Sequence, residues 1–256
     1  MSAKLERTGR DWIRCRRTIR WVEGSVGVID MPKFCRPEAY KLFGEQLPGI
    51  EHTENLWRAT AAIAMHAIDD VSLEAIDRRL ADLADRVRRG ANSGQEVALQ
   101  AHLHRVIFDE EGFAGNLKQY RNALNSYLPV VLETRCGLPI LLSLVYKVVA
   151  ERVSLRVEGV NSPGHFLCRA YVAGQPMLID PFFGGKLLTP DEARRRLSDM
   201  VGPDSLPDRE LFPSATHRQW LSRILMNLQR LFEDENRRSD LYAITELKLL
   251  LSRSAA

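Results

Sequence analysis

The sequence of 256 residues predicts an α+β fold: a helical N-terminal half packed on a core of one buried helix against an antiparallel sheet, followed by a C-terminal helical hairpin. Apolar residues recur at helical spacing from Pro37 to Phe108. A helix from Gly137 to about Val153 is apolar nearly all round, which is typical of burial on several sides. Short alternating segments between 155 and 180 then indicate strands, and two amphipathic segments follow.

Composition excludes several protein classes. Hydrophobic residues make up 45% and charged residues 27% of the chain, which excludes a disordered chain, a collagen and a disulfide-stabilised mini-protein. The longest apolar run, from Leu138 to Tyr146, is too short for a membrane span. The four cysteines are widely spaced and form no CxxC pair, so we expect no disulfides and a reducing, cytoplasmic location.

The first thirty residues differ from the remainder. Residues 1–20 carry seven basic and two acidic side chains, without an apolar stretch that could form a secretory signal. We expect 1–30 to be a basic arm that packs poorly, so that deleting it leaves the melting temperature nearly unchanged. One alternative is that Met31 is the true start. The net charge of +3 predicts no specific nucleic-acid partner, because the charge of an arm alone gives unspecific attraction to nucleic acid or to a membrane surface.

The helical half is bounded by clear signals. Pro37 suits a first helical turn, and Trp57 lies in a second apolar segment. Ser72 is a predicted N-cap for an amphipathic helix that ends at Gly90, and a further helix precedes Phe108. The stretch 122–129 is predicted to be a loop.

Strands are expected at 155–160, 165–172 and 176–180, and Ala173-Gly174 predicts a two-residue antiparallel turn. Thr189 would cap a short helix from Pro190 to Leu197, and the proline-rich stretch 202–213 would be a linker. The helices expected at 220–232 and 241–251 would form a hairpin that either packs on the core or ends a helical repeat.

His165 and Asp180 are the residues that could carry chemistry. In the predicted hairpin Asp180 faces Leu167, two residues from His165 on the same face, so the two side chains can meet. An aspartate there would fix the tautomer of the imidazole and favour its protonated form. The alternative is a structural histidine and an ordinary Asp-Pro turn.

Nothing in the sequence points to a metal or a cofactor. His102 and His104 lie two apart on a helix and would face different ways, so they are not expected to share a metal. The sequence contains no HExxH motif, P-loop or GxGxxG motif. We therefore expect no cofactor and no metal site.

Five short motifs occur in order: GFAGN at 112–116, NSYL at 125–128, RCGLPI at 135–140, GVNSPGHF at 159–166 and IDPFFGG at 179–185. Together they resemble the SirB-type branch of the transglutaminase-like superfamily. The resemblance implies a papain-like core within a transglutaminase-like domain at 31–200. It also implies that the hairpin at 214–253 is a truncated tetratricopeptide-like element.

The same resemblance bears on catalysis. Active members of the superfamily place a nucleophilic Cys at the start of the core helix, with His and Asp on the following strands; His165 and Asp180 match the latter two. The helix start at 137–142 contains no Cys, and the SirB-type pattern usually lacks it too. Cys136 lies just before the helix, where a thiolate is favoured, and is the one candidate nucleophile. Cys168 alternates away from His165.

Two functions stay open at this point, besides unspecific binding of nucleic acid or a membrane surface through the basic arm. The leading interpretation is a non-peptidase regulatory or protein-interaction module that retains His165 and Asp180 and has a protein or peptide partner. We then expect the two residues to be paired and Cys136 to be offset from them. The alternative is a cysteine hydrolase or acyl transferase that uses Cys136, His165 and Asp180. The sequence indicates neither substrate nor oligomeric state.

Overall fold

The computed structural model describes residues 31–91, 93–202, 206 and 212–254. The predicted basic arm at 1–30 lies outside these residues. Within them, no helix combines the length and the apolar character that crossing a membrane requires.

The N-terminal half is helical, as predicted. Its helices are α1 (Pro37–Gln46), α2 (Thr53–Ala67), α3 (Leu73–Gly90) and α4 (Glu96–His104), with a π-helical turn at Arg105–Glu110. Ser72 caps α3 because its Oγ accepts a hydrogen bond from the backbone N–H of Ala75 at 3.1 Å. The apolar face of α3 is fully buried at Leu80, Leu83 and Val87.

The loop predicted at 122–129 is wrong in part. A 3₁₀ turn at Ala123–Ser126 is followed by helix α5 (Leu128–Thr134). Pro129 lies in the first turn of α5, where its missing N–H costs no hydrogen bond. The short helix buries Leu128, Val131 and Leu132, so tertiary packing stabilises a segment that shows little helical signal by itself.

The sheet has five antiparallel strands in the order β6-β5-β4-β3-β7. They are β3 (Val157–Ser162), β4 (His165–Val172), β5 (Gln175–Asp180), β6 (Lys186–Leu188) and β7 (Ser214–Ala215). Val172 faces Gln175 across the turn, which is the predicted register. Both turn residues, Ala173 and Gly174, have positive φ (49° and 77°), as a type I′ turn requires. The strands β6 and β7 are short and were not predicted from the sequence.

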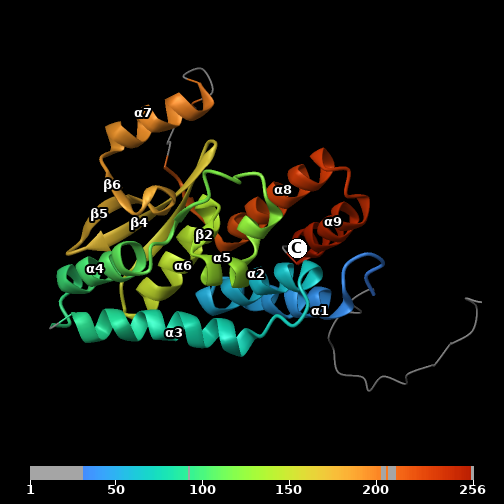
Figure 1. Cartoon of the computed structure of the whole chain (residues 1–256), viewed down its shortest axis with the longest axis horizontal. Coiled ribbons are helices and arrows are strands. Elements are labelled where there is room, and N and C mark those ends of the chain that lie inside the picture. Colours follow the sequence, from blue (N-terminus) through green and yellow to red (C-terminus); the bar gives the residue numbers. More distant parts are fainter. Residues whose placement is uncertain (1–30, 92, 203–205, 207–211, 255–256) are drawn as a thin grey trace, which may run out of the picture. The chain divides into compact units, whose positions relative to one another are not determined.

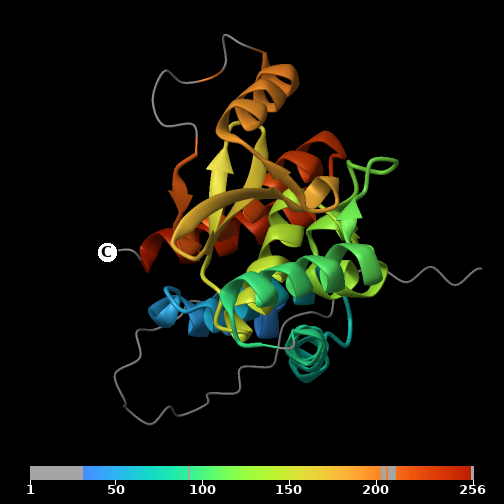
Figure 2. The ribbon, with the colours of Figure 1, turned by 90° about the vertical axis from the view of Figure 1, so that its left-hand side faces the viewer.

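Helices cover both faces of this sheet. Helix α6 (Pro139–Arg152) packs on one face, and α7 (Pro190–Val201) lies on the other (Figures 1 and 2). Thr189 caps α7 as predicted, although the helix continues beyond Leu197. Along β4, Phe166 and Cys168 face the main core with α6, whereas Leu167 belongs to a smaller cluster with Ala193 of α7.

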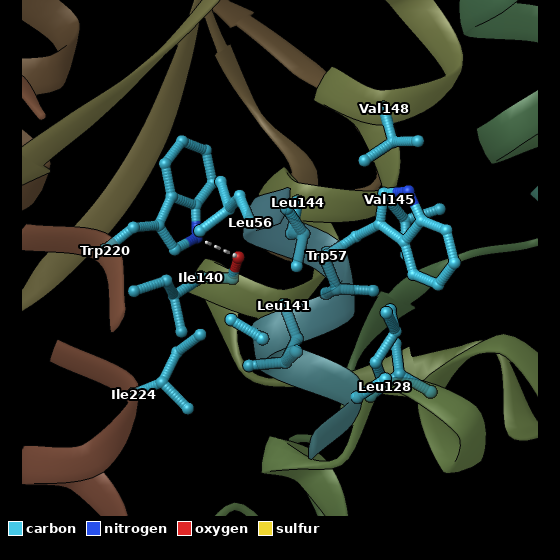
Figure 3. Packing of buried hydrophobic residues seen from close by; sticks show 14 of the residues in the cluster. Leu56, Trp57, Leu128, Ile140, Leu141, Leu144, Val145, Val148, Trp220 and Ile224 are labelled. Carbon is cyan, nitrogen blue, oxygen red and sulfur yellow. Dashed lines mark hydrogen bonds between the residues drawn. The ribbon is translucent and has the colours of Figure 1, made fainter. Parts of the chain in front are cut away.

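The C-terminal hairpin packs on the core. It consists of α8 (His217–Asp234) and α9 (Arg238–Arg253). Trp220 of α8 is fully buried, and its Nε1 donates a hydrogen bond to the carbonyl oxygen of Ile140 at 3.2 Å (Figure 3). Its ring centroid lies 4.7 Å from that of Phe166. The hairpin therefore packs on the core, around the start of α6, which is the first of the two alternatives predicted for it.

Candidate functional site

The structure brings His165 and Asp180 together. His165 is the first residue of β4 and Asp180 is the last residue of β5, so adjacent antiparallel strands place both at one end of the sheet. The His165 Nε2 and the Asp180 Oδ1 lie 3.0 Å apart. Both residues are buried, with exposed fractions of 5% and 0%. The pair is therefore a preformed feature of the folded core.

Local contacts hold the aspartate in place. Its Oδ1 also accepts a hydrogen bond from the backbone N–H of Phe182 at 3.2 Å, which caps the 3₁₀ turn at Pro181–Phe183. Its Oδ2 lies 3.7 Å from Nη1 of Arg196 on α7 and makes no hydrogen bond within the described chain. Asp180 is thus oriented by its own turn and faces a positive charge.

The imidazole has a defined orientation. Aromatic rings surround it: the centroid of Phe182 lies 6.0 Å away at 90° and that of Phe183 lies 6.2 Å away. Because Asp180 is an acceptor, it favours the tautomer with the proton on Nε2. Nδ1 then remains an acceptor, and no side chain in the described ranges bonds to it.

A cavity of about 440 Å³ opens beside His165. Its walls are the start of α6, the turn before β4, the segment before α5 and one face of α8. Polar and aromatic side chains line part of it: Tyr120, Ser126, His165, Arg223, Asn227 and Arg230. The start of α6 adds an apolar wall at 138–140. Here His165 meets accessible space that a ligand could occupy.

The motif at 125–128 builds the cavity wall. The Asn125 side chain donates hydrogen bonds to the carbonyl oxygens of Gln119 (2.6 Å) and Tyr120 (3.1 Å), and it accepts one from Asn116 Nδ2 (3.0 Å). The carbonyl oxygen of Asn125 accepts from the N–H of Leu138 at 3.0 Å. One buried asparagine therefore fixes the loop that carries Tyr120 and joins it to the start of α6.

Among the described residues, no cysteine lines the cavity beside His165 or forms a hydrogen bond with its imidazole. Cys136 lies in the two-residue strand β2 (Cys136–Gly137), which pairs in parallel with β1 (Ala114–Gly115). It is not among the described residues that line the cavity, and its sulfur makes no hydrogen bond to His165. Cys168 is buried against α6, where its Sγ donates to the carbonyl oxygen of Ser143 at 3.7 Å. Burial raises the pKa of the Cys168 thiol to about 12.

Two parts of the site could not be located from local sequence signals. Ser126 lies in the cavity, although its hydroxyl makes no hydrogen bond to His165 within the described residues. Arg223 and Arg230 line the same cavity from α8. Their spacing of seven residues on one helix face was an available signal, but it gives no indication of what that face contacts.

Two other histidines were considered as metal ligands, and neither of them lines the cavity beside His165. His102 and His104 are on α4, and the ring of His104 packs against that of Phe108. Within the described residues, no group of three His, Cys, Asp or Glu side chains is placed to hold a metal ion.

The sequence pattern of the transglutaminase-like superfamily matches residues 74–226. A UPF0162 protein of Xylella fastidiosa (strain 9a5c) is 37% identical over 150 residues, 56% of this chain and 53% of the relative. A UPF0162 protein of Pseudomonas aeruginosa is 35% identical over 122 residues, 48% of this chain and 44% of the relative.

A third relative has a different name. F-box only protein 21 of Homo sapiens is 32% identical over 163 residues, 52% of this chain and 26% of the relative. The chain thus spans about half the length of the UPF0162 relatives and about a quarter of the F-box protein. No solved structure matches.

Proposed function

This chain belongs to the transglutaminase-like superfamily, and we propose that it is a non-peptidase protein-interaction module with a regulatory role, in which His165 and Asp180 line a binding cavity. The matched segment occurs in UPF0162 proteins and in a much longer F-box only protein. Similar segments therefore occur in proteins of different length and name. This supports the proposal that the segment is a binding module within each of them.

The composition of the cavity carries this proposal. A nucleophile must come within about 3–4 Å of the base that activates it. Of the described residues that line the cavity, none is a cysteine, and the hydrogen bond of His165 goes to Asp180. The start of α6, where active members of the superfamily place the thiol, contributes Leu138, Pro139 and Ile140 instead.

Two finer assignments belong to the same proposal. The GVNSPGHF and IDPFFGG motifs support a place in the SirB-type branch, with the α8–α9 hairpin as a truncated tetratricopeptide-like element. The cysteines at 35, 136 and 168 are free thiols, which supports function in the reducing cytoplasm.

Thiol labelling tests whether a nucleophile is present. Wild type and His165→Ala are treated with iodoacetamide near pH ~6, where an unactivated thiol reacts slowly, and labelled sites are identified by peptide mass spectrometry. We expect Cys136 to react slowly and at the same rate in both proteins. His52→Ala, which removes an exposed histidine, is the matched control.

The opposite result would restore the enzyme alternative. Rapid, stoichiometric labelling of Cys136 that disappears in His165→Ala but persists in His52→Ala would establish a Cys136-His165-Asp180 triad. A fluorophosphonate probe examines Ser126 in the same way. Labelling of Ser126 that depends on His165 would likewise overturn the non-catalytic proposal.

A further inference from the structure

One face of α8 forms a long side of the cavity. The α8 residues that line it are Arg223, Asn227, Arg230, Leu231 and Asp234. Their spacing of four, three, one and three residues defines a single stripe along the helix. At 1.5 Å per residue, eleven residues extend about 16 Å along the helix axis. The cavity is therefore a groove with the length of about five residues of extended chain.

Arg223 is a half-buried cation that has no anionic partner among the described residues. Its guanidinium donates one hydrogen bond, from Nη1 to Asn161 Oδ1 at 2.8 Å, and no described carboxylate lies within 4.0 Å of it. Burial lowers the pKa of Arg223, and the nearby charge of Arg230 lowers it further. Arg230 also has no carboxylate within this distance among the described residues.

A half-buried arginine without a described carboxylate partner is unusual in this protein. Half-buried arginines on other elements have a carboxylate partner: Arg79 pairs with Glu111, and Arg152 with Asp77. Arg218 of α8 has none, but it donates to the carbonyl oxygens of 251 and 254 at the C-terminal end of α9. Arg223 instead faces a cavity with one neutral amide as its partner. An uncompensated buried charge is costly, and an anionic ligand would remove that cost.

The remainder of the groove suits a peptide. Leu138, Ile140 and Leu231 give it apolar surface, and Tyr120 is 47% exposed at its edge. At the far end of the stripe Arg121 forms an ion pair with Asp234, so the uncompensated positive charge lies between His165 and Arg230. The positive end of the α6 dipole adds to it. Duplex nucleic acid would need a broad basic surface, whereas this charge is confined to a narrow groove.

We propose that the groove between α8 and the start of α6 binds an extended acidic peptide segment, with one carboxylate on Arg223 and a second on Arg230. The two arginines are seven residues apart, which is about 10.5 Å along the helix axis. In a peptide with the extended polyproline II conformation, which has three residues per turn and rises about 3.1 Å per residue, side chains three residues apart lie on the same side, about 9 Å apart. The favoured ligand therefore carries two acidic residues three positions apart with an apolar residue between them. This inference rests on the proposed interaction function and specifies its partner.

Fluorescence anisotropy with two fluorescein-labelled peptides tests the inference. Each peptide has about ten residues of Gly and Ser around a central segment: one has two Glu three positions apart with Leu between them, and the other has Gln in place of Glu. We expect the Glu peptide to bind and the Gln peptide to bind at least tenfold more weakly, because each carboxylate–guanidinium pair is a charge-assisted hydrogen bond.

Variants of the full chain locate the binding. Arg223→Gln and Arg230→Gln should each weaken binding of the Glu peptide by about tenfold or more. Arg89→Gln makes the same charge change on the exposed side of α3 and should leave binding unchanged. Arg230 is exposed, so Arg230→Gln keeps the test valid should Arg223→Gln disturb the fold. Thermal melts monitored by circular dichroism check this for each variant.

Specific results would overturn the inference. Equal binding of the Glu and Gln peptides would do so, as would unchanged binding by the folded Arg230→Gln protein, or binding only of a single-stranded oligothymidine. The failure of the proposed function is a separate result: His165-dependent labelling of Cys136 or Ser126 would refute the non-catalytic role whatever the peptides do.

Discussion

Replacement of Glu111 by glutamine should destabilise the fold and make its stability less dependent on pH. The Glu111 carboxylate accepts hydrogen bonds from three arginines: Arg79 and Arg86 of α3, and Arg135, whose Nε lies 2.9 Å from Oε2. The Glu111 side chain is 7% exposed. This Glu111 cluster joins α3, the π-helical turn and the end of α5, directly before the strand that leads into α6.

The magnitude follows from these contacts. Glu111→Gln keeps the shape of the side chain but removes its charge and places an NH₂ group against guanidinium donors. A charge-assisted hydrogen bond contributes about 1.5–3 kcal/mol, and loss of one partner of a fully buried pair costs about 3–5 kcal/mol. The arginines are 27–49% exposed and partly hydrated, which reduces the loss. We expect about 2–3 kcal/mol, or a fall of roughly 5–10 °C in melting temperature.

The sign of the pH dependence is determined by the direction of the pKa shift. Burial raises the pKa of Glu111, but hydrogen bonds from Arg135, Arg86 and Arg79 outweigh this effect, so its pKa lies below the ordinary value of 4.5. A depressed folded-state pKa contributes stability above the unfolded-state pKa, and this stability is lost as the pH falls through the folded-state value. The difference between wild type and Glu111→Gln should therefore be constant near neutral pH and shrink below about pH 4.5.

Urea unfolding at a series of pH values measures this difference. The control is Glu110→Gln, a neighbouring acidic residue whose side chain is 36% exposed and which pairs with Arg86 and Arg105. That substitution should cost much less than Glu111→Gln, because the ion pairs of Glu110 are exposed to solvent. If Glu111→Gln costs no more than Glu110→Gln, or if its cost is the same at low and neutral pH, the reasoning is wrong.

One further substitution and one chemical labelling experiment test the packing of the core. Trp220→Phe should cost about 1.5–3 kcal/mol, because it removes the hydrogen bond to Ile140 and part of a fully buried ring; a cost below about 0.5 kcal/mol in urea unfolding would contradict this. Burial raises the pKa of Cys35 and of Cys168 to about 12. In the native protein at pH ~8, iodoacetamide should therefore modify the half-exposed Cys136 and leave Cys35 and Cys168 unmodified. These two thiols should react only after urea unfolds the chain. Native-state modification of Cys168 as fast as that of Cys136 would refute its burial.

Where short-range forces decide the conformation, the sequence was sufficient. Helix α3 begins after Ser72 and includes Gly90 because the cap, the apolar period and the terminal glycine all act within one helix. The β4–β5 register follows from Ala173-Gly174, because a two-residue turn with positive φ allows one pairing of the strands. That register alone predicted that His165 and Asp180 can meet, and they lie 3.0 Å apart.

Long-range packing decided the remainder, because its contacts join segments far apart in the chain. Helix α5 forms against the core although its residues show little helical periodicity. Cys136 lies in β2, which pairs with β1, and it is not among the residues that line the cavity. Arg223 reaches a cavity whose other walls come from segments about 60 to 100 residues earlier. A helical spacing specifies which side chains share a face, but the partner of that face depends on burial of apolar surface across the whole chain. The sequence by itself therefore determined the long helices, the strands β3 to β5 and the His165–Asp180 register, whereas the tertiary structure determined α5, β6, β7 and the groove.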